Sequence, residues 1–537
     1  MKSDGIDAWA ILPALLAAAV AAPLVGLPLS YAVAPGALSD FSGLVPEAVG
    51  ATVVVIAGAG AGTLVLGTAL AALVSFCDFP GRGWIEWALV LPLAMPGYVF
   101  TLFALGLDLP GIRSSFGAVC VFTLVLYPYV YLLARAAFLA QSRTLLEAAR
   151  GLGLSRRAAI ARVGLPLARP AILGGVALAL MEALADFGTV NLLGVPTFTD
   201  AIYQVWFIGF DRDAAMQLAT LLVSVTLTLL VLERLARGRA RYHQLAARGD
   251  LTPPVRLRGP AAAAAVVAPL ALVGFVVAAP LAQLAAWSIE AVREGLLAPE
   301  FATAARNSVL LAAMSALLVP LAAILLAYGA RASRSRTAAA LARAATIGYG
   351  LPGSVVAVAV IVPLSWIERR IDGVAGTGLL LTGTVIGLFY AYLVRFLALA
   401  WGAVEASLTR IPRQLDEAAR GLGSDRLDVL ARVHVPLVRA GLAIAALLVF
   451  VEVMKELPAT LLLRPLGGDT LAIAVWQATT ESLFETAALP ALLIVLVGLL
   501  PVAAMLRLSG RRGAELEATQ AAGTWAEELE QPEVVRA

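Results

Sequence analysis

The sequence has few charged residues and almost no cysteine or histidine. Of its 537 residues 14% are charged, and two are cysteines and two histidines. Cys77 and Cys120 can form neither a disulfide framework nor a cysteine-rich metal cluster, and two histidines add too few ligands for a haem, zinc or copper centre. So small a charged share also argues against a soluble globular domain, in which about a quarter of the residues are charged.

Lysine is also scarce, and this bears on nucleotide binding. Only Lys2 and Lys455 occur, and neither follows a glycine. A phosphate-binding loop of the form G-x-x-x-x-G-K-[ST] needs that lysine to reach the β- and γ-phosphates. We also find no nucleophile–base pair or metal constellation typical of a membrane enzyme. We therefore expect no ATPase site, no enzymatic activity and no cofactor bound by this chain.

Long apolar runs dominate the sequence instead. Hydrophobic residues make up 61% of the chain, and the mean hydropathy is +0.89. A helix needs roughly 20 apolar residues to cross a bilayer. Such runs occur at about 9–31, 50–75, 85–107, 116–140, 170–190, 214–233, 261–287, 307–329, 343–366, 377–400, 438–462 and 485–506. Because they lack the alternation of a membrane barrel, we expect an all-α polytopic membrane protein with about 12 transmembrane helices.

Basic residues concentrate in alternate segments between these runs. If the N-terminus is cytoplasmic, most arginines fall in cytoplasmic segments, as the positive-inside rule requires. Both termini are then cytoplasmic, and the first run is a retained helix because further spans follow it. The net charge of +3 is explained by these loops and predicts no nucleic-acid partner.

The chain repeats itself. Residues 147–153 and 417–423 both read EAARGLG, 270 residues apart (417 − 147). Glu182 and Glu452 have the same separation, whereas the Pro-Gly pair at 96–97 recurs at 352–353, 256 residues later (352 − 96). Two homologous six-helix halves, both starting in the cytoplasm, form a parallel repeat. We expect a first half at 1–240, a cytoplasmic linker at 241–259, a second half at 260–508 and a polar cytoplasmic tail at 509–537.

The repeated sequence lies in a cytoplasmic loop after the fourth span of each half. In the first loop we expect a short helix to end near Gly153, a second helix to start after Ser155, and that helix to end before Pro166. The second loop repeats the pattern at Gly423, Asp425 and Pro436. A charged loop that merely satisfies the positive-inside rule would explain the arginines. It would not explain glutamate, glycine and proline at the same spacing in two places.

These loops resemble the signature loop of the binding-protein-dependent permeases of ATP-binding-cassette importers. The residues that carry the resemblance are Glu147, Ala148, Ala149, Gly153 and Pro166, and then Glu417, Ala418, Ala419, Gly423 and Pro436. Valine replaces the usual isoleucine in both loops. The resemblance implies the transmembrane domain of a type I ABC importer. It also implies that the loops couple the chain to a dimer of cytoplasmic ATPase subunits, which hold ATP and magnesium.

Ionisable residues also occur within the spans that follow the two loops. The segments 181–190 and 451–460 read MEALADFGTV and VEVMKELPAT. They place Glu182, Asp186, Glu452 and Glu456 against one base, Lys455. A structural role is possible, because Glu452 and Lys455 can pair at i,i+3. Charges at membrane depth are costly, however, and usually line a pathway, so we predict that these five residues line the substrate route.

A pathway with an excess of carboxylates suits a hard cation and would repel sulfate, molybdate or phosphate. We expect no tightly bound metal, only transient cation contact at Glu182, Asp186, Glu452 and Glu456. This reasoning leaves ferric ion, amines and cationic vitamins open.

Two further segments resemble fused ferric-iron permeases. They are ADFGTVNLLGVPTFT (185–199) and EVMKELPATLLLRP (452–465). That resemblance implies a bacterial cytoplasmic (inner) membrane and a periplasmic or lipid-anchored solute-binding protein. Fused permeases for thiamine, polyamines or aminoethylphosphonate are similar enough to remain alternatives. An ion-gradient-driven secondary transporter is the alternative from another class, but it would not need the repeated cytoplasmic loop.

Overall fold

The computed structural model describes residues 8–141, 143–237, 254–333, 336–375 and 383–503. The predicted tail at 509–537 and most of the predicted linker lie outside the described residues. The described chain is built of helices, with one two-residue parallel pairing of β1 (Cys77–Asp78) with β2 (Val255–Arg256). The all-α prediction is confirmed.

The helices of the two halves follow in the same order. In the first half they are α1 (Ala8–Val33), α2 (Leu44–Phe76), α3 (Arg82–Ala88), α4 (Gly97–Gly106), α5 (Ser115–Leu139), α6 (Arg143–Gly151), α7 (Arg156–Ala159), α8 (Leu165–Ala185), α9 (Gly188–Leu192), α10 (Phe198–Phe207) and α11 (Arg212–Arg237). In the second half they are α12 (Pro260–Val273), α13 (Ala279–Glu294), α14 (Phe301–Ala332), α15 (Arg336–Ala344), α16 (Gly353–Ala375), α17 (Val385–Leu408), α18 (Arg413–Gly421), α19 (Arg426–Asp428), α20 (Val435–Met454), α21 (Pro458–Leu463), α22 (Leu471–Thr480) and a last helix, Phe484–Ala503.

Ten helices in the described chain are long and apolar enough to cross a membrane, and eleven if one bent pair counts as a span. The bent pair is the predicted span 85–107, which breaks by 89° between Arg82–Ala94 and Gly97–Gly106. Pro96 causes this break, because a residue before proline is driven out of the helical region, and Met95 is extended.

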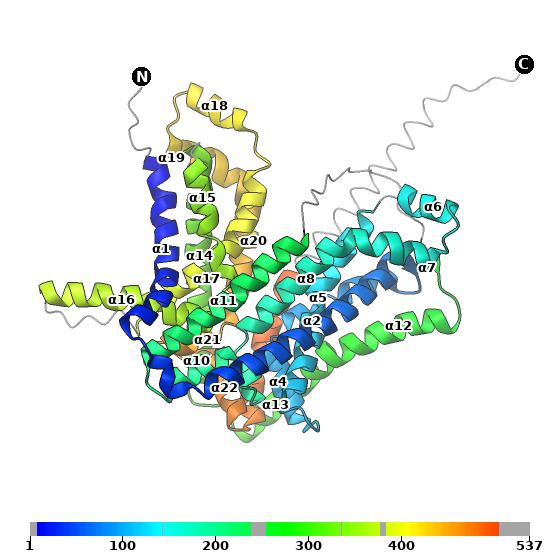
Figure 1. The fold of residues 1–537 in the computed structure, drawn as a ribbon, viewed down its shortest axis with the longest axis horizontal. Coiled ribbons are helices and arrows are strands. Elements are labelled where there is room, and N and C mark those ends of the chain that lie inside the picture. The colour runs from blue at the N-terminus through cyan, green and yellow to red at the C-terminus, as the bar shows by residue number, and fades with distance from the viewer. Residues whose placement is uncertain (1–7, 142, 238–253, 334–335, 376–382, 504–537) are drawn as a thin grey trace, which may run out of the picture.

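The second half has the same break at the equivalent proline. The predicted span 343–366 divides there into α15 and α16, since Leu351 before Pro352 is extended. The predicted span 377–400 is shifted to α17 at Val385–Leu408. Figure 1 shows α16 projecting sideways from the bundle. Its second half carries Glu368, Arg369, Arg370 and Asp372, so we do not count it as a span by composition.

The first helix of each half packs on the other half. Helix α1 contacts α14 and α16 of the second half, and α12 contacts α3 of the first. The π-helical segment Gly274–Ala278 joins α12 to α13, which reaches α4. The halves therefore interlock rather than meet along a flat interface.

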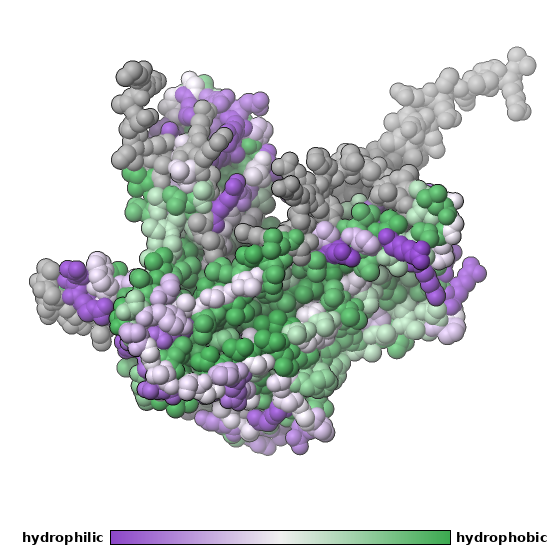
Figure 2. Space-filling view, viewed as in Figure 1, coloured by the Kyte–Doolittle hydropathy of each residue, from purple (hydrophilic) through white to green (hydrophobic). Residues whose placement is uncertain are grey.

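Both repeated loops lie on one side of the molecule. Figure 1 shows α6 and α18 at its upper side, well apart from each other, with α4, α13 and α22 at the opposite side. Hydrophobic residues cover much of the body between these two sides, and hydrophilic residues gather at the upper tips and the lower edge (Figure 2). This is the distribution expected of a protein with a lipid-facing belt and two aqueous surfaces.

Candidate functional site

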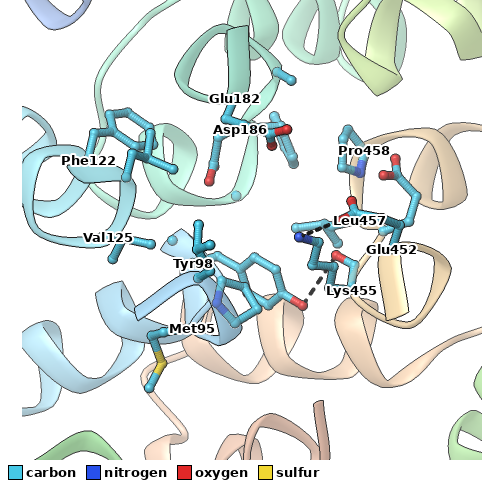
Figure 3. A pocket seen from close by; sticks show the side chains of 18 of the residues that line it. Met95, Tyr98, Phe122, Val125, Glu182, Asp186, Glu452, Lys455, Leu457 and Pro458 are labelled. Carbon is cyan, nitrogen blue, oxygen red and sulfur yellow. Dashed lines mark hydrogen bonds and ion pairs between the residues drawn. The ribbon is translucent and has the colours of Figure 1, made fainter. Parts of the chain in front are cut away.

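A cavity of about 90 Å³ lies where the two halves meet. The broken helix of the first half contributes Met95, Pro96 and Tyr98 to its wall. All five ionisable residues predicted to line a pathway also line it, from the ends of α8 and α20 and the turns that follow: Glu182, Asp186, Glu452, Lys455 and Glu456. Figure 3 shows Glu182 and Asp186 coming from one side of this space and Glu452 and Lys455 from another. The structure thus brings the predicted residues together.

Asp186 and Glu456 cap two short helices at equivalent positions. The backbone N–H and the hydroxyl of Thr189 donate to the Asp186 carboxylate at 2.7 and 2.9 Å, at the start of α9. The N–H of Ala459 donates to Glu456 Oε1 at 3.0 Å, at the start of α21. A carboxylate accepting from a first-turn N–H is a stabilising helix cap. These two side chains therefore have a local structural role as well as a place in the cavity wall.

The Pro-Gly pairs of the repeat pack directly against these capping carboxylates. A Cβ on Gly97 would lie 2.6 Å from Asp186 Oδ2, and a Cβ on Gly353 would lie 2.5 Å from Glu456 Oε1. Real Cβ atoms do not approach an oxygen so closely, so any larger residue at either position would displace the capping carboxylate. In each repeated Pro-Gly pair, the proline thus breaks a helix. The glycine allows the backbone to pack against the carboxylate that caps α9 or α21.

Two bases face the four acids in this cavity, because Arg395 joins Lys455 from outside the two segments that the sequence singled out. Lys455 Nζ pairs with Glu452 Oε1 at 2.8 Å, at the i,i+3 spacing that the structural alternative required. Arg395 of α17 lines the same cavity and pairs with Glu456 Oε1 at 3.2 Å. Its position in the first half is occupied by Val125, so both bases belong to the second half. An arginine within an apolar span was the signal that would have identified this residue.

No resident metal centre is evident in the part of the chain that the structure describes. Within it, no three His, Cys, Asp or Glu side chains are grouped so that they could hold a metal ion. The carboxylates of Asp186, Glu452 and Glu456 instead accept from N–H groups or pair with bases. The cavity can offer acidic oxygens to a passing ion, and the pathway role of these residues stays a prediction.

Side chains of both halves meet beside the cavity, near α9 and α22. The indole N–H of Trp476 donates to Asn191 Oδ1 at 2.9 Å, and Asn191 in turn donates to Asp200 at 2.7 Å. The ring of Trp476 also contacts Phe187 and Tyr203, with centroids 5.8 and 5.7 Å away. The sequence repeat does not predict this contact, because the residue equivalent to Asn191 in the second half is Leu461.

The two repeated loops, residues 143–166 and 413–436, have the same backbone geometry at their glycine stops. Gly153 and Gly423 each adopt φ +89°. The N–H groups of Leu154 and Ser424 donate to the carbonyls of Ala149 and Ala419, five residues back, which is the helix-ending bond of a Schellman motif. The glycine stops predicted for these two loops are confirmed.

The start of the next helix is also as predicted in both loops. Ser155 accepts from the N–H of Ala158, and Asp425 accepts from the N–H of Asp428 at 2.7 Å. The predicted end before proline is wrong. The helix continues past Pro166 and Pro436 into α8 and α20 through π-helical segments, Ile160–Gly164 and Val429–His434. A π turn bonds i to i+5, and this wider turn accommodates a proline that has no N–H to donate.

Each loop presents polar and apolar groups on its surface. Glu147 and Glu417 are exposed, and Leu152 and Leu422, just before the glycines, are 87% and 89% exposed. Ala149 is buried against its own half, which fixes the orientation of α6. Both loops thus expose one acidic and one apolar side chain at equivalent positions.

A largely buried ion pair holds the second loop to the bundle. Arg331, at the end of α14, donates to Asp416 of α18 at 2.9 Å and to the carbonyls of Leu408 and Ile411 at 2.9 and 3.0 Å. The fully buried His434 lies 2.8 Å from the other Asp416 oxygen. The equivalent residues in the first half are Ser75, Leu146 and Gly164. The two loops therefore share a backbone shape, but the residues at these three positions of the first half cannot form this ion pair.

One known protein family matches both halves of the chain. The family described as "Binding-protein-dependent transport system inner membrane component" matches residues 63–237 and again residues 319–513. Each match includes one of the two repeated loops and the helices that follow it. The two matches together cover more than half of the chain.

Among individual proteins, the chain is similar to an Fe(3+)-transport system permease protein of Haemophilus influenzae. The two are 27% identical over 451 residues, which is 82% of this chain and 86% of that protein. A probable molybdenum ABC transporter permease protein of Haloferax volcanii is 30% identical over 31% of this chain and 66% of its own. A molybdate/tungstate transport system permease protein of Thermococcus kodakarensis is 26% identical over 33% of this chain and 72% of its own.

Proposed function

This chain belongs to the family of binding-protein-dependent transport system inner membrane components, and from that premise we propose that it is the permease of a ferric-iron importer. The similarity to the Fe(3+)-transport permease carries this proposal, because it extends over 82% of the chain and so includes both halves. The molybdate-type relatives match only about a third of the chain. The excess of carboxylates in the cavity is consistent with a cationic substrate.

We propose that the coupling loops dock on two cytoplasmic ATP-binding-cassette subunits, which bind ATP and magnesium and hydrolyse the nucleotide. In support, the loops project from one side of the molecule (Figure 1) and expose Glu147, Leu152, Glu417 and Leu422. The lysine positions leave no phosphate-binding loop in this chain. The side with α6 and α18 would then face the cytoplasm of a bacterium, and both termini with it.

The opposite side would receive the substrate from a periplasmic or lipid-anchored binding protein. In the conformation observed, Trp476 and Asn191 join the halves beside the cavity. A movement of α8 and α20 driven from the coupling loops would reach the cavity directly, because each helix runs from its loop to the acidic residues. Alternating separation of the halves would then admit the ion from one side and release it to the other.

Molybdate is the second candidate substrate. Arg395 and Lys455 in the cavity favour it, together with the two molybdate-type relatives. Both bases are paired with glutamates, however, so an oxyanion would have to compete with Glu452 and Glu456 for them. The charge balance therefore favours the cation.

Uptake by vesicles that contain this chain, its ATPase subunits and its binding protein tests the proposal. We expect radioactive ferric ion to accumulate when ATP reaches the ATPase side, and an uncoupler at constant ATP to leave uptake unchanged. Uptake that stops with the uncoupler would favour the gradient-driven alternative. Uptake of molybdate, thiamine, a polyamine or aminoethylphosphonate in place of iron would keep the transporter class and reject the ferric assignment.

A further inference from the structure

A second, larger cavity lies in the second half, close to its coupling loop. It has a volume of about 470 Å³ and lies among α14, α15, α17 and α18. Arg331, Arg343 and Arg413 contribute to its wall, together with the Trp401 indole and the apolar side chains of Leu408 and Ile411. A volume of this size is in the range of small-molecule sites in proteins, roughly 300–1,000 Å³.

In the first half, the residues equivalent to those around this cavity include larger aromatic side chains. Leu408 and Ala332 correspond to Phe138 and Phe76, whose buried rings pack with centroids 5.1 Å apart. Arg343 corresponds to Trp87. In the wall of the open cavity, leucine and arginine thus stand where the first half has the aromatic rings of Phe138 and Trp87.

An ion pair of the first half is also missing at this place. Arg135 pairs with Glu86 in the first half, whereas the equivalent residues of the second half are Glu405 and Ala342. Glu405 accepts from the Trp401 indole N–H at 2.7 Å instead. The two halves therefore differ at this position both in the size of their side chains and in their charges.

The charges of the cavity are suited to an anion. Arg343 and Arg413 are exposed, and within the described chain no hydrogen bond or ion pair holds either guanidinium. The cavity also reaches the N-terminus of α18 at Pro412 and Arg413, where the helix dipole favours negative charge. Arginine binds phosphate oxygens in a bidentate manner. The polar part of the wall is thus suited to a phosphate group.

The rest of the wall is apolar and lies at the border of the membrane. Ala327, Ala330, Leu408 and Ile411 belong to spans or directly follow one, on the side of the coupling loops. A free phosphate would leave these side chains uncovered, whereas the glycerol and upper acyl carbons of a phospholipid would cover them. Tryptophan at this level is typical of the membrane interface, and basic pockets between spans on the cytoplasmic side bind anionic head groups.

We propose that this cavity is a binding site for an anionic phospholipid of the coupling-loop leaflet. The phosphate lies between Arg343 and Arg413, and the glycerol backbone lies against Leu408 and Ile411. Arg331 joins the site to Asp416 and so to α18. A bound lipid therefore stabilises the second coupling loop, and the first half has no equivalent site.

Native mass spectrometry of the purified full chain tests this site. Wild-type protein, titrated with phosphatidylglycerol and with phosphatidylcholine in detergent, should retain one phosphatidylglycerol about tenfold more tightly. The double variant Arg343→Gln/Arg413→Gln should lose this preference. The variant Leu408→Phe places the ring of the first half in the cavity wall and should exclude the lipid by filling the space. Arg157→Gln/Arg439→Gln, which removes two exposed arginines outside the cavity, is the matched control and should bind as wild type.

Thermal unfolding in the same detergent separates loss of the lipid from loss of the fold. Equal binding by wild type and both cavity variants overturns the proposal. Binding of inorganic phosphate that depends on Arg343 and Arg413, with no retained lipid, rejects the lipid source and makes the ligand a free anion. Loss of the preference in the arginine control would show that general surface charge attracts the lipid, which also overturns the site.

Discussion

The Trp476 indole N–H donates to Asn191 Oδ1 at 2.9 Å, and this bond joins the two halves of the chain beside the acidic cavity. Asn191 is itself held by Asp200, so the acceptor is fixed in position. Trp206, which corresponds to Trp476 in the repeat, instead lies under the guanidinium of Arg212. Both halves thus have a tryptophan at this position, but of the two only Trp476 donates to Asn191.

Trp476→Phe should weaken the closure on this side of the cavity. It keeps an aromatic ring beside Phe187 and Tyr203 but removes the donated hydrogen bond, at a cost of about 1 kcal/mol. We expect ATP hydrolysis by the assembled transporter to rise severalfold in the absence of the binding protein, because the halves separate more easily. Trp206→Phe is the matched control and should leave that basal rate unchanged. Equal basal rates in both variants would show that the bond does not hold the halves closed.

Replacing both coupling glutamates should uncouple transport. In the double variant Glu147→Gln/Glu417→Gln the backbone stops at Gly153 and Gly423 remain, so the loops keep their shape. We expect at least a tenfold loss of uptake, weaker association with the ATPase subunits and normal amounts of the chain in the membrane. Glu300→Gln, outside both loops, is the control. Wild-type uptake and association in the double variant would refute the docking assignment.

Removing the Asp416 charge should loosen only the second loop. In Asp416→Asn, Arg331 remains buried, 13% exposed, without its ionic partner, and the expected loss of stability is about 1–3 kcal/mol. Ser75→Ala changes the residue equivalent to Arg331 in the first half, and the Ser75 hydroxyl has no partner in the described chain. That control should be close to neutral.

Hydrogen exchange across the two loops is the measurement for this pair of variants. Faster exchange should appear at residues 413–434 in Asp416→Asn and should leave residues 147–164 unchanged. Equal acceleration in both loops would mean that the ion pair stabilises the whole bundle rather than one coupling loop.

Amide substitutions in the acidic cavity should divide into two groups. Glu182→Gln and Glu452→Gln remove charge without changing a helix cap, so ferric uptake should fall. Glu452→Gln also leaves Lys455 without its ionic partner, which should lower the stability by about 1–3 kcal/mol. Asp186→Asn and Glu456→Gln also weaken helix caps and should in addition cost about 1 kcal/mol. Lys455→Gln frees Glu452, and we expect it to slow release of the ion more than its entry.

Uptake at matched expression, combined with thermal unfolding, checks these five variants. Docking of the binding protein should stay intact in all of them. If the four acidic variants transport as wild type, these carboxylates are structural, and the ferric proposal then rests on similarity alone.

The sequence by itself determined the membrane class, the duplication and the shape of the coupling loops. Twenty-residue apolar runs have few alternatives to a membrane helix. The glycine stops and the Ser155 and Asp425 caps are local, because each is formed by atoms within five residues. Helix stops and caps that recur at the same spacing can therefore be predicted from the sequence before the fold is known.

Only the tertiary structure decided which residues meet across the chain. Arg395 enters the acidic cavity from α17, and Trp476 reaches Asn191 from the other half, contacts that no local pattern specifies. Helices α8 and α20 continue through their prolines from π-helical segments, which the proline positions alone did not predict. The cavity at Arg343 has Leu408 in its wall where the first half has the larger ring of Phe138. Packing between distant segments decides such features, and a single segment of sequence does not encode them.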